Sequence, residues 1–335
     1  MPPWISSLAD TNTVPDINDV RTAVARVRSI LKPTPLMEFE QINALINARV
    51  LLKCETLHPV GAFKIRGAWN FISQLSPEEL RRGVIAYSSG NHAQAVAWVA
   101  RKLNTTATIV MPKDAPTIKI NNTRKYKANV VLYDRKNENR EQIAYDLSQD
   151  LGAIIVPPYD HPKIIAGQGT IGVEIVEQCN AASIVPDVLV VPCSGGGLVS
   201  GCSIPLKNAF PAVRIFSAEP DGFDDTRRSL EAGKRLSNQG DAESICDALL
   251  ADTPGEITFK INRRNLEGGI KVCDTKVREA MITIFSATGL VVEPAGAIGL
   301  AATLQTDFDP PAKTICVVLS GRNVDSHSFA EILSS

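Results

Sequence analysis

The chain has 335 residues, a hydrophobic content of 44%, a charged content of 21% and a formal net charge of −1. A chain of this length buries a sizeable core and is expected to form two lobes. The nearly neutral charge offers no global attraction for nucleic acid or for an anionic membrane. No apolar run reaches the roughly 18 residues of a membrane span. We therefore expect a globular protein without a nucleic-acid or membrane partner.

The seven cysteines are scattered singly, without a CxxC pair, and the four histidines show no metal-ligand spacing. This pattern favours reduced thiols over a disulfide framework and gives no support for a zinc site. The opening residues lack a basic region followed by an apolar stretch, so no signal peptide is expected. A cytoplasmic location is the resulting expectation.

The first 80 residues predict a helix, a strand and a segment that carries a lysine. Asp16 can cap a helix over 15–32, and Pro33 ends it. Residues 49–53 form a short strand that leads to the stretch GAFKIRGAWN at 61–70. A helix is predicted from residue 67 to 75, and a short one opens at Ser76.

From residue 84 onward, the pattern becomes strand, loop and helix in regular succession. Strands are predicted over 84–87, 106–111, 129–133, 153–156, 188–191, 214–218 and 314–319. Helices are predicted over 93–103, 116–126, 138–151, 164–178, 198–210, 226–232, 275–288 and 294–303. Short apolar strands alternating with helices indicate an α/β fold with a parallel sheet covered on both faces. The stretch 233–271 shows no clear element.

Lys64 lies between Phe63 and Ile65, with small residues on both sides. An apolar setting disfavours the charged form of a lysine and frees its amine as a nucleophile. An ordinary solvated lysine is the alternative. The choice between the two depends on the motifs found elsewhere in the chain.

A glycine-rich loop, SGGGL at 194–198, follows a predicted strand and precedes a predicted helix. Consecutive glycines let the backbone approach a ligand closely, and a helix N-terminus adds amide donors and the positive end of the helix dipole. This combination is typical of a phosphate cradle, although a tight turn has the same composition. No Lys-Ser/Thr pair follows, so nucleotide hydrolysis has no support.

Two further polar turns, SSGNH at 88–92 and LSGRN at 319–323, stand at predicted strand ends. The first places hydroxyls and a side-chain amide at a helix start, which suits a carboxylate and is also ordinary turn chemistry. Parallel α/β sheets bind their ligands at such strand ends. A lysine, a phosphate cradle and a carboxylate receptor together indicate pyridoxal phosphate and an amino-acid substrate.

These motifs resemble the serine/threonine dehydratase and serine racemase family of pyridoxal phosphate enzymes, which includes 3-hydroxyaspartate dehydratases. The resemblance runs from about residue 34 to 328 and rests on the motifs at 62–68, 88–94, 165–170, 194–197 and 320–325. It implies a two-domain fold like that of tryptophan synthase β, in which each lobe is an open, mostly parallel sheet with helices on both faces. The implied domains are a large cofactor-binding domain (1–82 plus 161–335) and a small mobile domain (83–160). A homodimer is also implied.

The resemblance also implies roles for individual residues. Lys64 forms the Schiff base with the cofactor and removes the substrate α-proton. Residues implied to hold the cofactor are Phe63, Lys64, Asn91, Ser194, Gly195, Gly196, Gly197, Leu198 and Ser320. Asn91 would bond the ring 3-hydroxyl and the loop amides the phosphate, while Ser320 would face the ring nitrogen as a neutral hydroxyl that favours elimination. Ser88, Asn91 and His92 would hold the α-carboxylate.

This chain departs from the family pattern at a few positions. Ser194 replaces the first glycine of a four-glycine loop, Arg322 replaces a small residue near the cofactor, and Ala248 stands where relatives often carry glycine. These substitutions leave open how tightly the loop encloses the phosphate and where the Arg322 guanidinium lies.

Ser89 and Arg140 bear on the reaction and the substrate. In racemases a serine at the position of Ser89 supplies a proton opposite the lysine, whereas many threonine dehydratases have alanine; Ser89 is equally well explained as a turn residue. Arg140 matches an arginine that faces the substrate side chain in serine racemases and 3-hydroxyaspartate dehydratases. A guanidinium suits a second carboxylate, although surface arginines are common on helices.

An acidic segment at 219–225 matches the place where relatives bind Mg²⁺ or Ca²⁺. The implied ligands are Glu219, the carbonyl of Phe223 and Asp225, and hard oxygen ligands suit Mg²⁺, Ca²⁺ or Mn²⁺. A solvated acidic loop is the alternative. Gln94, Tyr126 and Asn323 match part of a nucleotide effector site, but too few residues match to predict one.

We therefore predict a pyridoxal phosphate-dependent dehydratase that eliminates water from L-serine, L-threonine or 3-hydroxyaspartate to give a 2-oxo acid and ammonia. A serine or aspartate racemase is the alternative within catalysis. A non-catalytic pyridoxal phosphate-binding protein is the alternative outside it. The sequence leaves the particular hydroxy amino acid and its stereoisomer open.

Overall fold

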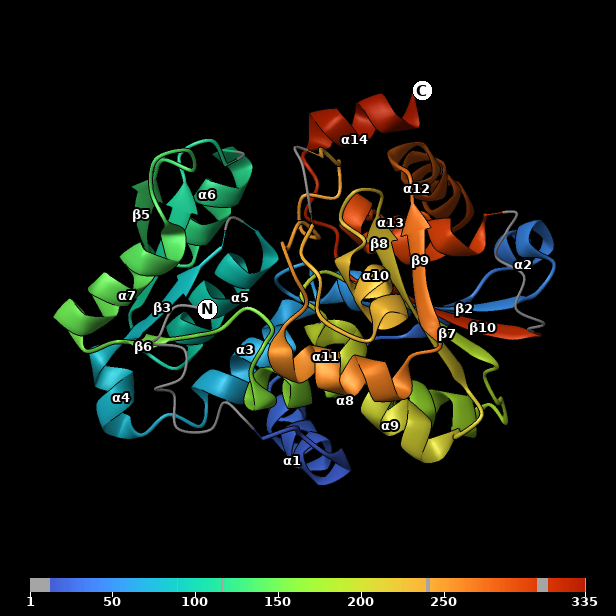
Figure 1. Cartoon of the computed structure of the whole chain (residues 1–335), viewed down its shortest axis with the longest axis horizontal. Coiled ribbons are helices and arrows are strands. Elements are labelled where there is room, and N and C mark those ends of the chain that lie inside the picture. Colours follow the sequence, from blue (N-terminus) through green and yellow to red (C-terminus); the bar gives the residue numbers. More distant parts are fainter. Residues whose placement is uncertain (1–12, 89, 116, 239–241, 306–312, 335) are drawn as a thin grey trace.

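The computed structural model describes residues 13–88, 90–115, 117–238, 242–305 and 313–334, and their elements form two groups, each around one sheet (Figure 1). The larger sheet has six strands in the order β1-β2-β10-β7-β8-β9, and the smaller has four in the order β5-β4-β3-β6. Only β1 and β2 pair antiparallel among the described strands. Two mostly parallel sheets confirm the predicted α/β class.

The larger sheet consists of β1 (Leu36–Glu38), β2 (Arg49–Cys54), β7 (Val188–Pro192), β8 (Arg214–Pro220), β9 (Gly268–Val272) and β10 (Thr314–Leu319). The smaller consists of β3 (Val84–Tyr87), β4 (Ala107–Pro112), β5 (Asn129–Tyr133) and β6 (Ile154–Ile155). The helices are α1 (Ile17–Arg28), α2 (Glu40–Ile46), η2 (Glu55–Leu57), α3 (Lys64–Ile72), α4 (Pro77–Arg82), α5 (Asn91–Lys102), α6 (Thr117–Lys125), α7 (Arg140–Leu151), α8 (Pro162–Ala181), α9 (Gly197–Ala209), α10 (Asp225–Ala232), α11 (Glu256–Asn265), α12 (Asp274–Thr288), α13 (Pro294–Thr303) and α14 (Ser326–Leu333).

Both faces of the larger sheet are buried. Neighbouring residues of a strand point to opposite faces, and in β10 Val317 and Leu319 belong to one apolar cluster while Cys316 and Val318 belong to another. Residues of α12 and α13 complete the first cluster, and residues of α8 and α9 complete the second. Helices on both faces explain why these strands are almost continuously apolar.

The smaller sheet is covered in the same way. Ile85 and Val110 pack with Ala144 of α7 on one face, while Ala86 and Met111 pack with α5 on the other. The cluster on the α5 face also contains apolar residues of α3. The helix that begins with Lys64 therefore packs against the elements of the smaller sheet.

Most elements predicted from the sequence are present, with small shifts at their ends. Helix α3 begins at Lys64 rather than at residue 67, because Phe63 already has helical torsion angles (φ −62°, ψ −23°). The sequence missed β1, α2, α11, β9 and α14. In α11, polar Thr258 and Asn262 are buried together with the apolar residues. The buried face therefore does not appear in the sequence as apolar residues at helical spacing.

No helix among the described residues has the length and the apolar character needed to cross a membrane.

A buried cluster of charges joins α3 to the larger sheet and to α8. Arg66 Nε lies 2.7 Å from Glu55 Oε2, and Arg66 Nη1 lies 2.6 Å from Glu174 Oε1. Lys53 Nζ lies 2.7 Å from Glu174 Oε2. Burial alone would lower the pKa of Arg66, but the two carboxylates outweigh it and raise that pKa. The guanidinium therefore stays charged and binds the two acidic side chains together.

Substituting Arg66 by Met should destabilise the protein strongly, because the buried carboxylates of Glu55 and Glu174 would lose the guanidinium that they share. Removing one partner of a buried ion pair costs about 3–5 kcal/mol. Arg28→Met removes the exposed Arg28–Glu177 pair and should cost no more than about 1 kcal/mol. Urea unfolding followed by circular dichroism measures both losses. Equal losses in the two variants would contradict this account of the cluster.

Candidate active site

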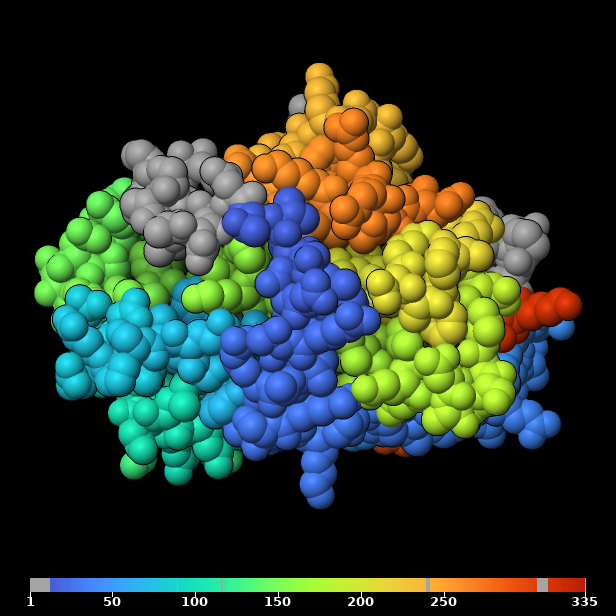
Figure 2. All heavy atoms as spheres, turned by 90° about the horizontal axis from the view of Figure 1, so that it is seen from below, coloured from blue at the N-terminus to red at the C-terminus, as the bar shows by residue number. Residues whose placement is uncertain are grey.

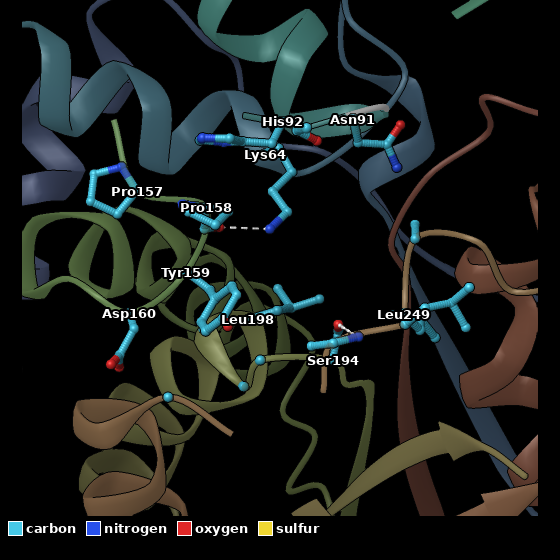
Figure 3. Close-up of a pocket in the computed structure, with 18 of the residues that line it drawn as sticks. Lys64, Asn91, His92, Pro157, Pro158, Tyr159, Asp160, Ser194, Leu198 and Leu249 are labelled. Atoms are coloured by element: carbon cyan, nitrogen blue, oxygen red, sulfur yellow. Dashed lines mark hydrogen bonds between the residues drawn. The ribbon is translucent and has the colours of Figure 1, made fainter. Parts of the chain in front are cut away.

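A cavity of about 570 Å³, seen in Figure 3, is lined by residues that follow the carboxyl ends of β3, β7 and β10. Ser88 follows β3, Ser194 follows β7 and Ser320 follows β10, and all three line the cavity. Lys64 and Tyr159 line it as well. The volume falls in the range of small-molecule sites, and strand ends are where parallel α/β sheets place their ligands.

Lys64 directs its amine into this cavity from the first turn of α3 (Figure 3). Its Nζ donates a hydrogen bond to the carbonyl of Pro158 over 2.7 Å and lies 5.2 Å from the centre of the Phe63 ring. Burial lowers the pKa of Lys64 to about 8. More of the amine is therefore unprotonated near neutral pH than in a solvated lysine, and the unprotonated form is the one that a nucleophile requires.

Close packing of α3 on α8 holds Lys64 in place. The backbone N–H of Gly67 donates to Gln168 Oε1 over 3.3 Å. A Cβ on Gly167 would come within 2.7 Å of the Gly67 Cα, so both positions need glycine. This contact explains Gly167 of the motif at 165–170, which allows the helix bearing the lysine to approach α8 closely. A Cβ on Gly169 would instead meet Val20 of α1 and the carbonyl of Gly201 in α9.

The glycine loop adopts the geometry of an anion cradle. Gly196 has φ +92°, a left-handed conformation that favours glycine, and Gly197 opens α9. A Cβ on Gly196 would come within 2.9 Å of Thr258, and one on Gly195 would overlap the ring of Tyr159. The loop therefore presents backbone amides at a helix N-terminus, the arrangement that binds phosphate.

The serine that replaces a glycine in this loop serves as an anchor. Ser194 Oγ accepts a hydrogen bond from the backbone N–H of Ala251 over 3.2 Å. It thereby connects the loop to residues 247–252, which also line the cavity. Arg322 does not line the cavity; its guanidinium donates to the carbonyl of Thr56.

Asn91 and His92 begin helix α5 and line the cavity. The side-chain amide of Asn91 donates to Glu293 Oε1 over 2.6 Å. His92 Nε2 lies 3.0 Å from the carbonyl of Val156, and burial, followed by the nearby Lys64, lowers the pKa of His92 to about 3. A neutral His92 adds no positive charge, so anion binding here depends on backbone amides of α5 and on neutral donors.

The structure places two of the three remaining active-site residues predicted from the sequence, Ser320 and Arg140, at the cavity. Ser320 is buried, and its Oγ donates over a long 3.5 Å to the carbonyl of Ala295. Arg140 begins α7, lines the cavity and has its guanidinium 6.0 Å from the centre of the Tyr87 ring. Ser89 lies outside the described residues.

Sequence reasoning missed four charged residues that line or adjoin the cavity. Lys119 of α6 pairs with Asp247 at the cavity wall, and Arg235 donates to the carbonyl of Pro254 over 2.8 Å. Glu293 is 1% exposed, and its burial raises the pKa of its carboxyl to about 7. The sequence does contain one signal for Glu293: it is a lone acid in the apolar run at 290–295.

The acidic segment predicted to bind a metal lies away from the cavity lining. Glu219 and Asp225 are both fully buried. Glu219 accepts hydrogen bonds from the backbone N–H groups of Thr226 and Arg227 over 2.9 and 2.8 Å. Asp225 Oδ2 is buried without a hydrogen-bond partner among the described residues. No group of three or more His, Cys, Asp or Glu that could hold a metal occurs within the described ranges.

An amine of lowered pKa beside an anion cradle and a buried hydroxyl defines a site for pyridoxal phosphate. Residues 27–321 match the family described as pyridoxal-phosphate dependent enzyme, and the chain belongs to that family. The family and cofactor expected from the motifs are thereby confirmed.

Several relatives are similar over nearly their full length. The chain is 38% identical over 321 residues to an L-threo-3-hydroxyaspartate ammonia-lyase of Saccharomyces cerevisiae, covering 96% of this chain and 97% of the relative. It is 38% identical over 317 residues to a serine racemase of Oryza sativa subsp. indica, covering 92% and 91%. The solved structure of maize serine racemase superimposes with a TM-score of 0.90 at 36% identity, covering 96% of this chain and 98% of that one.

The residues of the cavity fit the cofactor. Side chains at Gly195 and Gly196 would clash with Tyr159 and Thr258, so the loop can keep its backbone in this position only with glycine there. Lys64 supplies the amine on the opposite wall (Figure 3). The Ser320 hydroxyl makes only a long contact with the protein, so it is available to a ligand.

Replacing Lys64 by Ala should remove both the visible absorbance of the bound cofactor and all turnover, if Lys64 is the amine that attaches the cofactor as expected from the motif. Absorption spectroscopy and a 2-oxo acid assay measure the two effects. Lys102→Ala, at the exposed end of α5, is the control and should behave like the unmodified protein. Retained absorbance and turnover in Lys64→Ala would refute the assignment.

Proposed function

We propose that this protein is an ammonia-lyase that uses pyridoxal phosphate to eliminate water from a 3-hydroxy amino acid, giving a 2-oxo acid and ammonia. The observation that carries the proposal is the Lys64 amine, whose pKa is lowered by burial, in one cavity with the glycine cradle and the neutral Ser320 hydroxyl. The S. cerevisiae relative, whose name states an ammonia-lyase, supports the same reaction class.

The chain offers a contact to each part of the cofactor. The amides of Gly195, Gly196, Gly197 and Leu198 bind the phosphate, with Ser194 beside them. Asn91 binds the ring hydroxyl, Phe63 lies beside the ring, and Ser320 faces the ring nitrogen. When bound, the cofactor acts as an electron sink for the substrate α-carbon. A serine hydroxyl carries no charge, which favours loss of a leaving group over a long-lived carbanion.

The remaining residues bind the substrate and move its proton. Ser88, Asn91 and His92 hold the α-carboxylate at the N-terminus of α5, where backbone amides favour an anion. The Lys64 amine takes the α-proton, and the bond from the β-carbon to its hydroxyl oxygen breaks. The departing hydroxyl takes up a proton from a nearby acid and leaves as water. A second water later hydrolyses the released enamine to the 2-oxo acid and ammonia.

Arg140 favours a substrate with a second carboxylate. Its guanidinium lines the cavity from the start of α7, beside Tyr87. A guanidinium can bind a carboxylate with two parallel hydrogen bonds. We therefore place 3-hydroxyaspartate ahead of serine and threonine, in agreement with the name of the S. cerevisiae relative.

Arg140→Met should lower kcat/KM for 3-hydroxyaspartate by about tenfold or more, the usual cost of losing a hydrogen bond to a charged group. The values for L-serine and L-threonine should change far less, because they lack the second carboxylate. Release of 2-oxo acid and D-amino acid is measured with L-serine, L-threonine and each 3-hydroxyaspartate isomer. Arg124→Met, on α6 outside the cavity lining, is the control. Equal losses on all substrates would exclude Arg140 from substrate selection.

Racemisation of serine or aspartate is the second candidate function. Serine racemases are among the similar proteins, both in sequence and in structure. Ser89 would supply the proton on the face opposite Lys64. D-Amino acid in excess of 2-oxo acid in the assay above would favour racemisation. A purified protein without colour and without either product would favour a non-catalytic binding protein.

We also propose a divalent cation, Mg²⁺ or alternatively Ca²⁺ or Mn²⁺, bound by Glu219, the Phe223 carbonyl and Asp225. Two buried carboxylates and the unpartnered Asp225 Oδ2 support it. Burial, followed by repulsion from Asp225, raises the pKa of Glu219 to about 8. A cation would compensate the charges that this environment disfavours.

Chelation by EDTA should lower the thermal unfolding midpoint, and added Mg²⁺ should restore it, because a bound ion stabilises the folded state. Asp225→Asn should abolish this response by removing one charged ligand. Asp221→Asn, at an exposed acid nearby, should retain it. A midpoint indifferent to both EDTA and Mg²⁺ would rule out the cation.

Three further features are proposed with the function. Residues 83–160, which contain the whole smaller sheet, form a small mobile domain, and 1–82 plus 161–335 form the large domain. Two such chains form a homodimer. The protein works in the cytoplasm, because its seven cysteines are all free and most are buried.

A further inference from the structure

A chain of hydrogen bonds runs from a backbone carbonyl to a buried carboxyl through two asparagine side chains. Asn323 Nδ2 donates to the carbonyl of Val60 over 2.9 Å and to Asn91 Oδ1 over 2.7 Å. Asn91 Nδ2 then donates to Glu293 Oε1 over 2.6 Å. Both Asn91 and Glu293 are buried.

The Val60 carbonyl determines the direction of every hydrogen bond in this series. A backbone carbonyl only accepts hydrogen bonds, so Asn323 must turn its NH₂ group toward Val60. The same NH₂ group faces Asn91, which must therefore present its oxygen. The amide nitrogen of Asn91 consequently lies on the side of Glu293, whose carboxyl oxygen accepts one of its two N–H groups.

The second N–H of Asn91 has no acceptor among the described residues. Asn91 lines the cavity, and its amide nitrogen is turned toward that cavity in Figure 3. A buried donor without a partner is costly. This N–H is therefore reserved for a ligand acceptor in the cavity.

The local backbone holds the two residues that flank Asn91. Asn323 follows a short antiparallel bridge between Ala62 and Gly321, and the backbone N–H of Arg322 donates to the carbonyl of Gly61 over 2.8 Å. Glu293 lies so close to Gly321 that a Cβ there would overlap Glu293 Oε1. Gly321 is thus the position that gives the Glu293 carboxyl room to reach Asn91.

We propose that Asn323 and Glu293 are positioning residues that hold the Asn91 amide in one orientation, with its second N–H directed at the ring hydroxyl of pyridoxal phosphate. The inference rests on the role proposed for Asn91 in cofactor binding. It assigns a function to Glu293 and Asn323 that does not depend on which amino acid is the substrate.

The test is the dissociation constant of pyridoxal phosphate from five variants, measured together with the visible spectrum of the bound cofactor. Glu293→Gln keeps an acceptor oxygen for Asn91 and should bind within about twofold of the unmodified protein. Glu293→Met and Asn323→Leu release Asn91 and should bind at least about tenfold more weakly. Asn323→Asp should also bind more weakly, because a carboxylate cannot donate to Asn91.

Comparing these variants separates the orientation of the Asn91 amide from effects on folding and on charge. Glu293→Gln and Glu293→Met both remove a charge, so a difference between them reports the acceptor. Asn323→Leu adds no charge, so weaker binding there excludes repulsion of the phosphate as the cause. Gly321→Ala, which displaces the Glu293 carboxyl by its volume alone, should weaken binding as Glu293→Met does. Far-UV circular dichroism of each cofactor-free variant checks its fold.

The proposal is overturned if Glu293→Met and Asn323→Leu bind the cofactor as tightly as the unmodified protein. It is equally overturned if Glu293→Gln binds as weakly as Glu293→Met. Neither result depends on product formation, so a failure of the proposed dehydratase activity would be seen separately in the 2-oxo acid assay.

Discussion

The ion pairs of Arg66 with Glu55 and Glu174 connect the segments on which the site depends. Glu55 follows β2, Arg66 belongs to α3, and Glu174 belongs to α8. Because water is excluded from this cluster, separating any one segment would strand a buried charge. The helix that begins with Lys64 is therefore held between the larger sheet and α8. The lysine acquires its position from charges buried on the far side of its own helix.

The contacts proposed for the cofactor come mainly from neutral donors, although charged side chains such as Lys119 and Asp247 also line the cavity. In the proposed site, backbone amides form the phosphate cradle and the Ser320 hydroxyl faces the ring nitrogen, while burial lowers the pKa of His92 and keeps it neutral. Burial also lowers the pKa of Lys64. One physical cause, the exclusion of water from the cavity, thus lowers the pKa of both Lys64 and His92.

The local motifs could be predicted because each is complete within one turn. The glycine loop at 194–198 and the turn at 88–92 both join a strand to a helix, and the strand–turn–helix pattern is visible in the sequence. Glu293 could not be assigned in this way, since its partner Asn91 comes from a distant part of the chain and is itself bonded by Asn323. Helix α11 was missed because its polar Thr258 and Asn262 are buried like its apolar residues.

The sequence by itself determined the α/β class, the glycine loop and Lys64 as the candidate nucleophile, because alternating apolar strands and helix-opening turns are short-range features. Only the tertiary structure decided how these turns face one another across a single cavity. It also decided that Arg322 points away from the cavity, that Ser194 anchors its loop to Ala251, and that Asn91 is held between Asn323 and Glu293. Such pairings join residues remote in the chain, and only packing and the burial of polar groups specify them.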